Sequence, residues 1–183
     1  MAQKRLVIDG FGQLELNNVA FRRDGRIEAQ CKPDKAAFAA KHIDYIENGM
    51  LLAVDNVKRV VAPATDASLP IALVYSAEHM YDERANALKD FKLNLEDDFL
   101  PRLGYLAVGD KFTTNCLAYE GTLENLNTAL DAIATTPLYG GIDASGAIAI
   151  STTKPTAGPV LKVIQKTTMP DTQLGVKFQV LAD

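Results

Sequence analysis

The chain has 183 residues, which suits one domain, or one domain with an extended arm, and allows a sizeable core without metals or disulfides. Its 23 acidic and 19 basic residues give a net charge of -4, which argues against a protein whose main role is to hold nucleic acid. No apolar run is long enough for a membrane span, and the first ten residues are not a signal peptide. Composition therefore predicts neither direct nucleic-acid binding nor membrane attachment.

The first residues contain one short strand candidate, Arg5–Ile8, followed by Phe11 between Gly10 and Gly12. The two glycines predict that this piece bends or stays mobile. It is interpreted as an edge strand, or alternatively as an arm that docks on a neighbouring subunit. We therefore divide the chain into an N-terminal arm at residues 1–17 and a single β-rich globular domain at residues 18–183.

A hairpin is the clearest local signal, and it lies within Asn18–Cys31. Apolar and polar residues alternate on both sides of Asp24-Gly25, a pair that favours a type I′ turn because both central residues need positive φ. The expected tip carries three arginines, Arg22, Arg23 and Arg26. A solvated tip explains such a cluster, and a contact with an acidic partner surface is the functional alternative.

Further elements follow from capping residues, turns and hydrophobic spacing. Asp34 is the expected cap of a short helix within Pro33–His42, and Thr122 caps a second within Thr122–Ile133. Turns at Asn48-Gly49 and Asp55-Asn56 divide Ile43–Val61 into two or three strands, which favours an antiparallel sheet or barrel. The other expected strands are Leu69–Tyr75, Leu103–Ala107, Phe112–Leu117, Ala147–Ile150, Val160–Ile164 and Val176–Leu181, with a charged helix at Met80–Phe91 and breaks that include Gly140-Gly141.

Together these elements predict an α+β fold that is mainly β. We expect an antiparallel sheet or a barrel or sandwich, with two short helices and an extended N-terminal arm. Cys31 and Cys116 lie far apart without a CxxC spacing, so we expect both to be reduced and buried in a cytosolic protein, with a disulfide as the alternative.

The sequence offers no catalytic signature. His42 and His79 lack the spacing of metal ligands, and Glu96-Asp97-Asp98 is better explained as a solvated acidic loop than as a cation site. Phosphate-binding and nucleophile motifs are also missing from the sequence. We therefore predict no catalytic residue, no metal and no cofactor, and keep a hydrolase with an unrecognised site as the less favoured alternative.

Four stretches carry a resemblance to a known family: IENGMLLAV (Ile46–Val54), LVYSAEHMYDERANALKDF (Leu73–Phe91), LGYLAVGDKFTTN (Leu103–Asn115) and GVKFQVL (Gly175–Leu181). In this order they resemble the auxiliary head proteins of tailed bacteriophages, which are the cement or decoration proteins that bind a major-capsid lattice. The resemblance implies a structural virion protein, not an enzyme, that is made in the host cytoplasm and binds the outside of the capsid. The alternative is a tail-tube or head–tail connector component.

The resemblance also implies two kinds of partner. One is the lattice of the major capsid protein, and the other is a further copy of the chain, in a dimer or trimer. We expect the contacts with the shell to come from the N-terminal segment and the arginine-rich tip, that is from Lys4, Arg5, Phe11, Arg22, Arg23 and Arg26.

Overall fold

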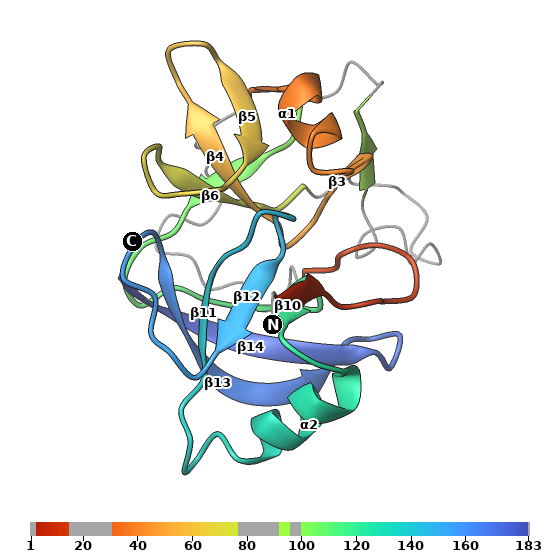
Figure 1. The fold of residues 1–183 in the computed structure, drawn as a ribbon, viewed down its shortest axis with the longest axis vertical. Helices are drawn as coiled ribbons and strands as arrows, with labels where there is room; N and C mark the ends of the chain where they lie inside the picture. Colours follow the sequence, from red (N-terminus) through yellow and green to blue (C-terminus); the bar gives the residue numbers. More distant parts are fainter. Residues whose placement is uncertain (1–2, 15–30, 77–91, 96–99, 183) are drawn as a thin grey trace.

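A computed structural model describes residues 3–14, 31–76, 92–95 and 100–182. These residues form sheets of seven, five and two strands, together with two helices. The five-stranded sheet and α1 occupy the upper part of Figure 1, and the long strands of the seven-stranded sheet lie below with α2. The predicted fold class, mainly β with antiparallel pairing and two short helices, is confirmed.

The five-stranded sheet is built from the first half of the body. Its strands, in spatial order, are β2 (Lys32–Pro33), β5 (Val60–Pro63), β4 (Leu51–Asp55), β6 (Ile71–Val74) and β8 (Leu103–Tyr105). All neighbours are antiparallel except β2 and β5. The predicted turn after Asp55 joins β4 to β5, and Asp55 pairs with Val60 across this hairpin.

Helix α1 (Lys35–Ala39) packs beside β5 and begins where the sequence predicts. The Asp34 side chain accepts a hydrogen bond from the main-chain amide of Ala37 at 3.1 Å, which satisfies one of the donors that a helix start leaves unpaired. Phe38 is fully buried, so the short helix is held mainly by this one side chain.

Asn48 and Gly49 make the predicted turn, but the strands on either side of it do not form a hairpin. β3 (Tyr45–Glu47) pairs with β7 (Lys92–Asn94), whereas β4 belongs to the five-stranded sheet. The reason lies in a contact distant in sequence. The Asn48 side chain donates to the carbonyl of Ser76 at 3.0 Å and accepts from the Ser76 amide at 2.7 Å, which fixes the turn beside the end of β6.

The seven-stranded sheet carries most of the second half of the chain. In spatial order its strands are β1 (Lys4–Arg5), β10 (Leu117–Tyr119), β12 (Ile148–Ser151), β11 (Tyr139–Ile142), β13 (Val160–Thr168), β14 (Leu174–Ala182) and β9 (Lys111–Thr114). Only β10 and β12 are parallel. The single strand predicted at Phe112–Leu117 is wrong, because Asn115 and Cys116 separate β9 from β10 at the opposite side of the strand order. The sheet therefore curls until its two edges lie close together.

Strand β11 contains Gly140 and Gly141, where the sequence predicts a break. That prediction is wrong because the glycines serve close packing within the strand. A Cβ atom on Gly140 would lie 2.8 Å from Cγ2 of Ile148, and one on Gly141 would lie 2.8 Å from Cγ of Pro155. Close approach of neighbouring side chains explains glycine within a strand.

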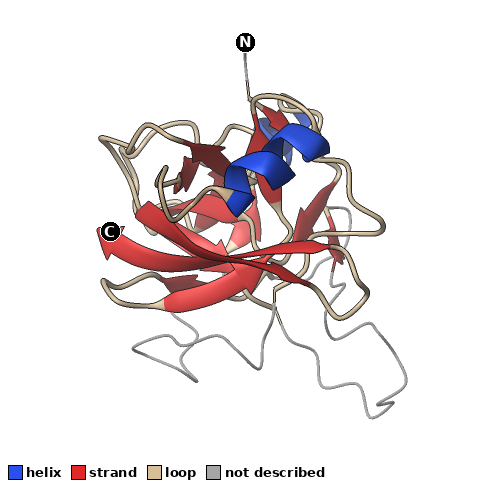
Figure 2. Ribbon diagram, turned by 90° about the horizontal axis from the view of Figure 1, so that it is seen from below, coloured by secondary structure: helices blue, strands red, loops and turns tan. Residues whose placement is uncertain are grey.

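Helix α2 (Leu123–Asp131) covers one face of the seven-stranded sheet, as Figure 2 shows. Thr122 caps it as predicted, and the side chain of Asn125 completes a capping box. Leu126 and Leu130 are the buried residues of this helix. Neither helix in the described part of the chain is both long and apolar enough to cross a membrane.

Several predictions fall outside the described residues. These are the hairpin tip with Arg22, Arg23 and Arg26, the helix at Met80–Phe91, His79, and the acidic run Glu96-Asp97-Asp98.

Candidate interaction surface

The N-terminal segment, residues 3–14, runs antiparallel to residues 114–119. Lys4 pairs with Tyr119 in the edge strand β1, which covers Lys4–Arg5 and not the expected Arg5–Ile8, and Leu14 bridges to Thr114. Between these pairings residues 7–12, which we call the N-terminal loop, leave the sheet and bend at Gly10 (φ 74°). The bend expected from the two glycines is therefore present.

Arg5 fixes the start of this segment to the body. Its guanidinium forms a two-pronged ion pair with Glu47 at the end of β3, with Nη1 to Oε1 at 3.0 Å. The Glu47 side chain is only 7% exposed, and its Oε2 also accepts from the main-chain amide of Gly12. One buried carboxylate therefore holds both ends of the N-terminal loop.

The same loop is held at its middle by Gln173, in the connection between β13 and β14. The Gln173 side chain donates to the Asp9 carbonyl at 2.9 Å and accepts from the Asp9 amide at 2.8 Å. Its amide nitrogen also donates to Asp171, which accepts a second bond from the side chain of Gln13. These contacts join the N-terminal loop to the hairpin formed by β13 and β14.

The predicted contact residues take different positions on this segment. Lys4 is exposed on β1, and Phe11 is partly exposed, with its ring edge-on to Tyr45 at 5.5 Å between centroids. Arg5 instead faces Glu47, so its described role is to position the segment. Val7 is 94% exposed on the N-terminal loop, and the sequence prediction missed it as a contact candidate. Arg22, Arg23 and Arg26 lie outside the described residues.

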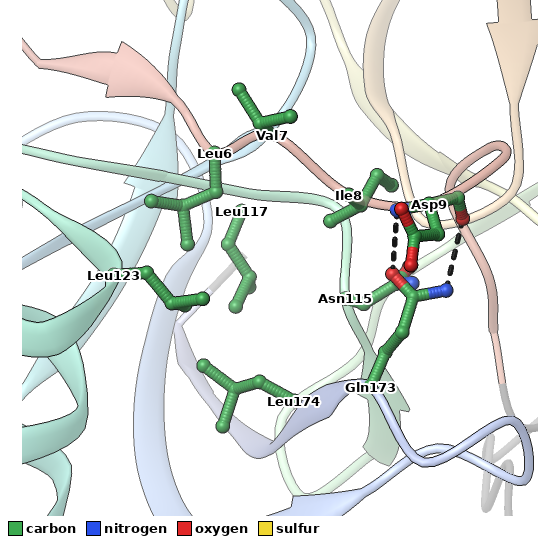
Figure 3. A pocket seen from close by; sticks show the side chains of 9 residues that line it. All are labelled: Leu6, Val7, Ile8, Asp9, Asn115, Leu117, Leu123, Gln173 and Leu174. Atoms are coloured by element: carbon green, nitrogen blue, oxygen red, sulfur yellow. Dashed lines mark hydrogen bonds between the residues drawn. The ribbon is translucent and has the colours of Figure 1, made fainter.

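A half-open pocket of about 280 Å³ lies beneath the N-terminal loop. Figure 3 shows its two unlike ends. Leu6, Leu117, Leu123 and Leu174 form an apolar end, whereas Asp9, Asn115 and Gln173 form a polar end. These residues come from the N-terminal segment, the β9–β10 connection, β10, α2, the β13–β14 connection and β14, so no local sequence motif could have grouped them.

Within the described residues, two buried polar atoms near this pocket have no hydrogen-bond partner: Nδ2 of Asn115 and Oε1 of Gln13. The orientation of each amide follows from its other contact. The Gln13 main-chain amide donates to Oδ1 of Asn115 at 2.6 Å, which leaves Nδ2 as the unpaired atom. Likewise Nε2 of Gln13 donates to the Asp171 carboxylate, which leaves Oε1 unpaired.

Metal-ligand types do not gather elsewhere on the described surface. Among residues 3–14, 31–76, 92–95 and 100–182, no group of three or more His, Cys, Asp or Glu side chains could hold a metal ion. His42 is exposed, just beyond α1, at a positive φ of 55°.

Comparison with known proteins gives no relative for this chain. No family model matches it, and neither a curated protein nor a solved structure matches it.

Cys116 should resist chemical modification in the folded protein. Burial raises the pKa of its thiol to about 12, against an opposing effect of the Arg5 charge, so almost no thiolate forms at pH 8. Since the thiolate is the reactive form, we expect alkylation at least ~100-fold slower than in the unfolded chain. Iodoacetamide labelling of a Cys31→Ser variant, with and without denaturant, measures this ratio. Equal rates in the two conditions would contradict the buried position.

Asp171 should make the folded state less stable in acid. Burial works to raise the pKa of this carboxyl, but hydrogen bonds from Gln13 and Gln173 outweigh it and hold the pKa below its usual range. The folded-state pKa is lower than that of the unfolded chain, so the contribution is complete above pH ~4 and is lost as pH falls through the folded pKa. We expect the free energy of unfolding of wild type to exceed that of Asp171→Asn at pH 7 and the difference to shrink in acid. Urea unfolding across pH measures it, and a constant difference would contradict the assignment.

Proposed function

We propose that this chain is a capsid cement or decoration protein of a tailed bacteriophage, which binds the outside of the major-capsid lattice and stabilises the head. The proposal extends to a dimer or trimer of the chain as the bound unit, since closed symmetric oligomers are the usual form. It does not assign the chain an enzymatic activity. The main support for the proposal is that the stretches carrying the resemblance lie next to one another in the fold.

The stretches that resemble this family pack against one another. Leu51 of the first stretch pairs with Leu73 of the second, and Val74 pairs with Leu103 of the third. In the seven-stranded sheet, Phe112 of the third stretch pairs with Phe178 of the fourth, with ring centroids 5.6 Å apart. As far as they are described, the four stretches are therefore connected parts of the two main sheets. The stretches that carry the resemblance therefore belong to the body of the fold, and this supports the proposal.

A cement protein needs a body that keeps its shape and a surface segment that its neighbour can contact. The two sheets supply the first, and the N-terminal segment, anchored by Glu47 and Gln173, supplies the second. Modest contacts are sufficient on a shell, because a subunit that binds at several sites at once gains apparent affinity from each link. Lys4, Val7 and Phe11 are the described residues that we assign to the contact.

Counting copies in the particle tests the proposal. Quantitative mass spectrometry of purified virions gives the ratio of this chain to the major capsid protein. A ratio near one, or a simple fraction of one, supports a cement protein. A much smaller number of copies would instead favour a connector or tail component, and absence from virions would overturn the structural role.

The assigned contact gives a sharper prediction on the same particles. Val7→Asp introduces a charge at a position that is 94% exposed, so folding should be unaffected while occupancy of heads falls. Val57→Asp is the matched control, since Val57 is also 94% exposed but lies in the β4–β5 turn. Rebinding of each purified variant to heads stripped of this chain measures occupancy. Equal binding of the two variants would exclude the N-terminal loop as the contact.

A further inference from the structure

The seven-stranded sheet carries a row of polar side chains on the face that points away from α2, which we call the outer face. Phe178 of β14 packs in one core cluster with Leu126 of α2, so the neighbouring residue Lys177 points to the outer face. Lys177 pairs with Gln165 of β13 on one side and with Thr113 of β9 on the other. An ammonium group, a carboxamide and a hydroxyl therefore lie side by side on this face.

These three side chains line a second pocket, which is half-open and has a volume of about 320 Å³. The end of β13 and the connection that follows it complete the wall, with Thr167, Thr168, Met169 and Pro170. The pocket therefore combines one cationic side chain with three hydroxyls and a carboxamide.

Thr113 is the residue in this pocket that lacks a partner within the protein. It is only 4% exposed, yet its hydroxyl makes no hydrogen bond with any described residue. It is not one of the inaccessible unpaired atoms of the described residues, which belong to Asn115 and Gln13, so the hydroxyl can be reached from the pocket that Thr113 lines. A polar group that is largely buried and open on one side is expected to find its partner there.

The charge on the outer face is positive. Lys162 and Lys111 both pair with Gln179, which lies two residues along β14 from Lys177. Within the described residues none of these three lysines forms an ion pair, and no acidic side chain lines the pocket or belongs to either row. Since the whole chain has a net charge of -4, this face is a local region of positive potential.

The donors in the pocket fit an oxyanion. The ammonium group supplies the opposite charge, and the hydroxyls and the carboxamide supply neutral donors from more than one strand. A tetrahedral phosphate or sulfate group matches several donors better than a carboxylate does, because it offers more acceptor oxygens. Met169 and Pro170 give the pocket an apolar part of the wall, which leaves room for the group that carries the anion.

We propose that this pocket binds a phosphate or sulfate group, with the ammonium of Lys177 as the opposite charge and the hydroxyl of Thr113 as a fixed donor. The other hydroxyls and the carboxamide complete the set of donors, and the two neighbouring lysines attract the anion from a distance. The inference goes beyond the proposed function, because the site belongs to the isolated chain and needs no capsid.

Titration with phosphate tests the site in the full-length protein. The isotope-labelled chain receives inorganic phosphate or phenyl phosphate, with acetate and with sodium chloride of matched ionic strength as comparisons. We expect both phosphates to shift the NMR signals of Thr113, Thr168 and Lys177, with a dissociation constant on the order of millimolar. Acetate should bind at least ~3-fold more weakly, and chloride should leave the signals in place. Tighter binding of phenyl phosphate than of inorganic phosphate assigns the anion to an ester, and equal or weaker binding assigns it to the free ion.

Two variants and a control separate the charge from the hydroxyl. Lys177→Gln removes the charge and keeps a donor, and should weaken phosphate binding about 10-fold. Thr113→Val replaces the hydroxyl with a methyl group, and should weaken binding at least ~3-fold without lowering the free energy of unfolding, since the hydroxyl has no partner among the described residues. Lys166→Gln is the matched control and should leave binding unchanged, because Lys166 lies on the other face of β13, opposite the buried Val176, and pairs with Asp131.

Four results would overturn the proposal. Phosphate in excess could leave all of these signals in place, or chloride at the same ionic strength could shift them equally. Equal weakening by Lys166→Gln and Lys177→Gln would reduce the effect to general surface charge. A lower free energy of unfolding for Thr113→Val would show that the hydroxyl bonds within the protein and not to an anion. Tighter binding of a short single-stranded oligonucleotide than of phenyl phosphate would replace the pocket with an extended nucleic-acid surface.

Discussion

Replacing Gly49 with alanine is expected to lower the free energy of unfolding of the protein strongly. Gly49 has a φ of 86°, which alanine adopts at a cost of about 1 kcal/mol or more. A Cβ atom there would also lie 2.2 Å from Oγ1 of Thr114. Thr114 cannot easily turn away, because this oxygen donates to the carbonyl of Gln13 and accepts from the amide of Cys116. Together the two effects should cost more than about 3 kcal/mol, which is a large part of the stability of an ordinary domain.

Gly109→Ala is the control that separates the two effects. Gly109 has a similar φ of 98°, but an added Cβ atom would have nothing within 4 Å. It should therefore lose only the backbone contribution of about 1 kcal/mol. Urea unfolding followed by circular dichroism gives the free energy of unfolding of both variants. If the two variants lose the same amount, the contact between Gly49 and Thr114 is not as close as described.

Local signals predicted the elements that depend on a few neighbouring residues. Asp34 and Thr122 each cap a helix because the cap bond joins residues only three apart. The turn after Asp55 was also predictable, since its side chain accepts from the amides of Val57 and Lys58. Each of these bonds joins residues within one turn of the chain, so the local sequence is sufficient to predict it.

Interactions distant in sequence decide the features that the pattern missed. Asn48-Gly49 turns the chain, but Ser76, 28 residues away, determines which strands it separates. A pair of glycines is typical of a strand break, yet Gly140 and Gly141 lie within β11. The close approach of the Ile148 and Pro155 side chains leaves no room for a larger residue there. Strand length was underestimated for the same reason. β13 and β14 continue beyond the predicted Val160–Ile164 and Val176–Leu181 because they pair with each other along most of their length.

The candidate surface was predictable only in part. The N-terminal segment was selected from its glycines and short strand, but none of its anchors was recognised. Gln173 and Asp9 are 164 positions apart, and an amide that pairs with a main chain leaves no motif. One signal was available for Glu47, since a carboxylate among Ile46, Met50 and Leu51 predicts a buried acid that needs a cationic partner. Arg5, 42 residues earlier, supplies it.

Removing Arg5 is expected to give the second large effect, because it leaves the Glu47 carboxylate buried without its cation. Breaking a buried pair at one partner costs up to several kcal/mol, and since the Arg5 side chain is 26% exposed we expect about 2–3 kcal/mol for Arg5→Met. The loop should also open locally before the body unfolds, because the amide of Gly12 bonds to the same carboxylate. Chemical denaturation measures the first effect, and hydrogen exchange at Gly12 measures the second.

The ion pair between Lys166 and Asp131 is the matched control. Its nitrogen and oxygen are 2.8 Å apart, but the two side chains are 32% and 69% exposed, so Lys166→Met should cost less than about 1 kcal/mol. The single variant Glu47→Gln and the double variant Arg5→Met/Glu47→Gln complete a mutant cycle, since glutamine keeps an acceptor for Gly12 and carries no charge. We expect the double variant to be more stable than Arg5→Met alone. If it is instead less stable, burial of the charge is not the cause, and the N-terminal segment is held mainly by Leu14 and Gln173.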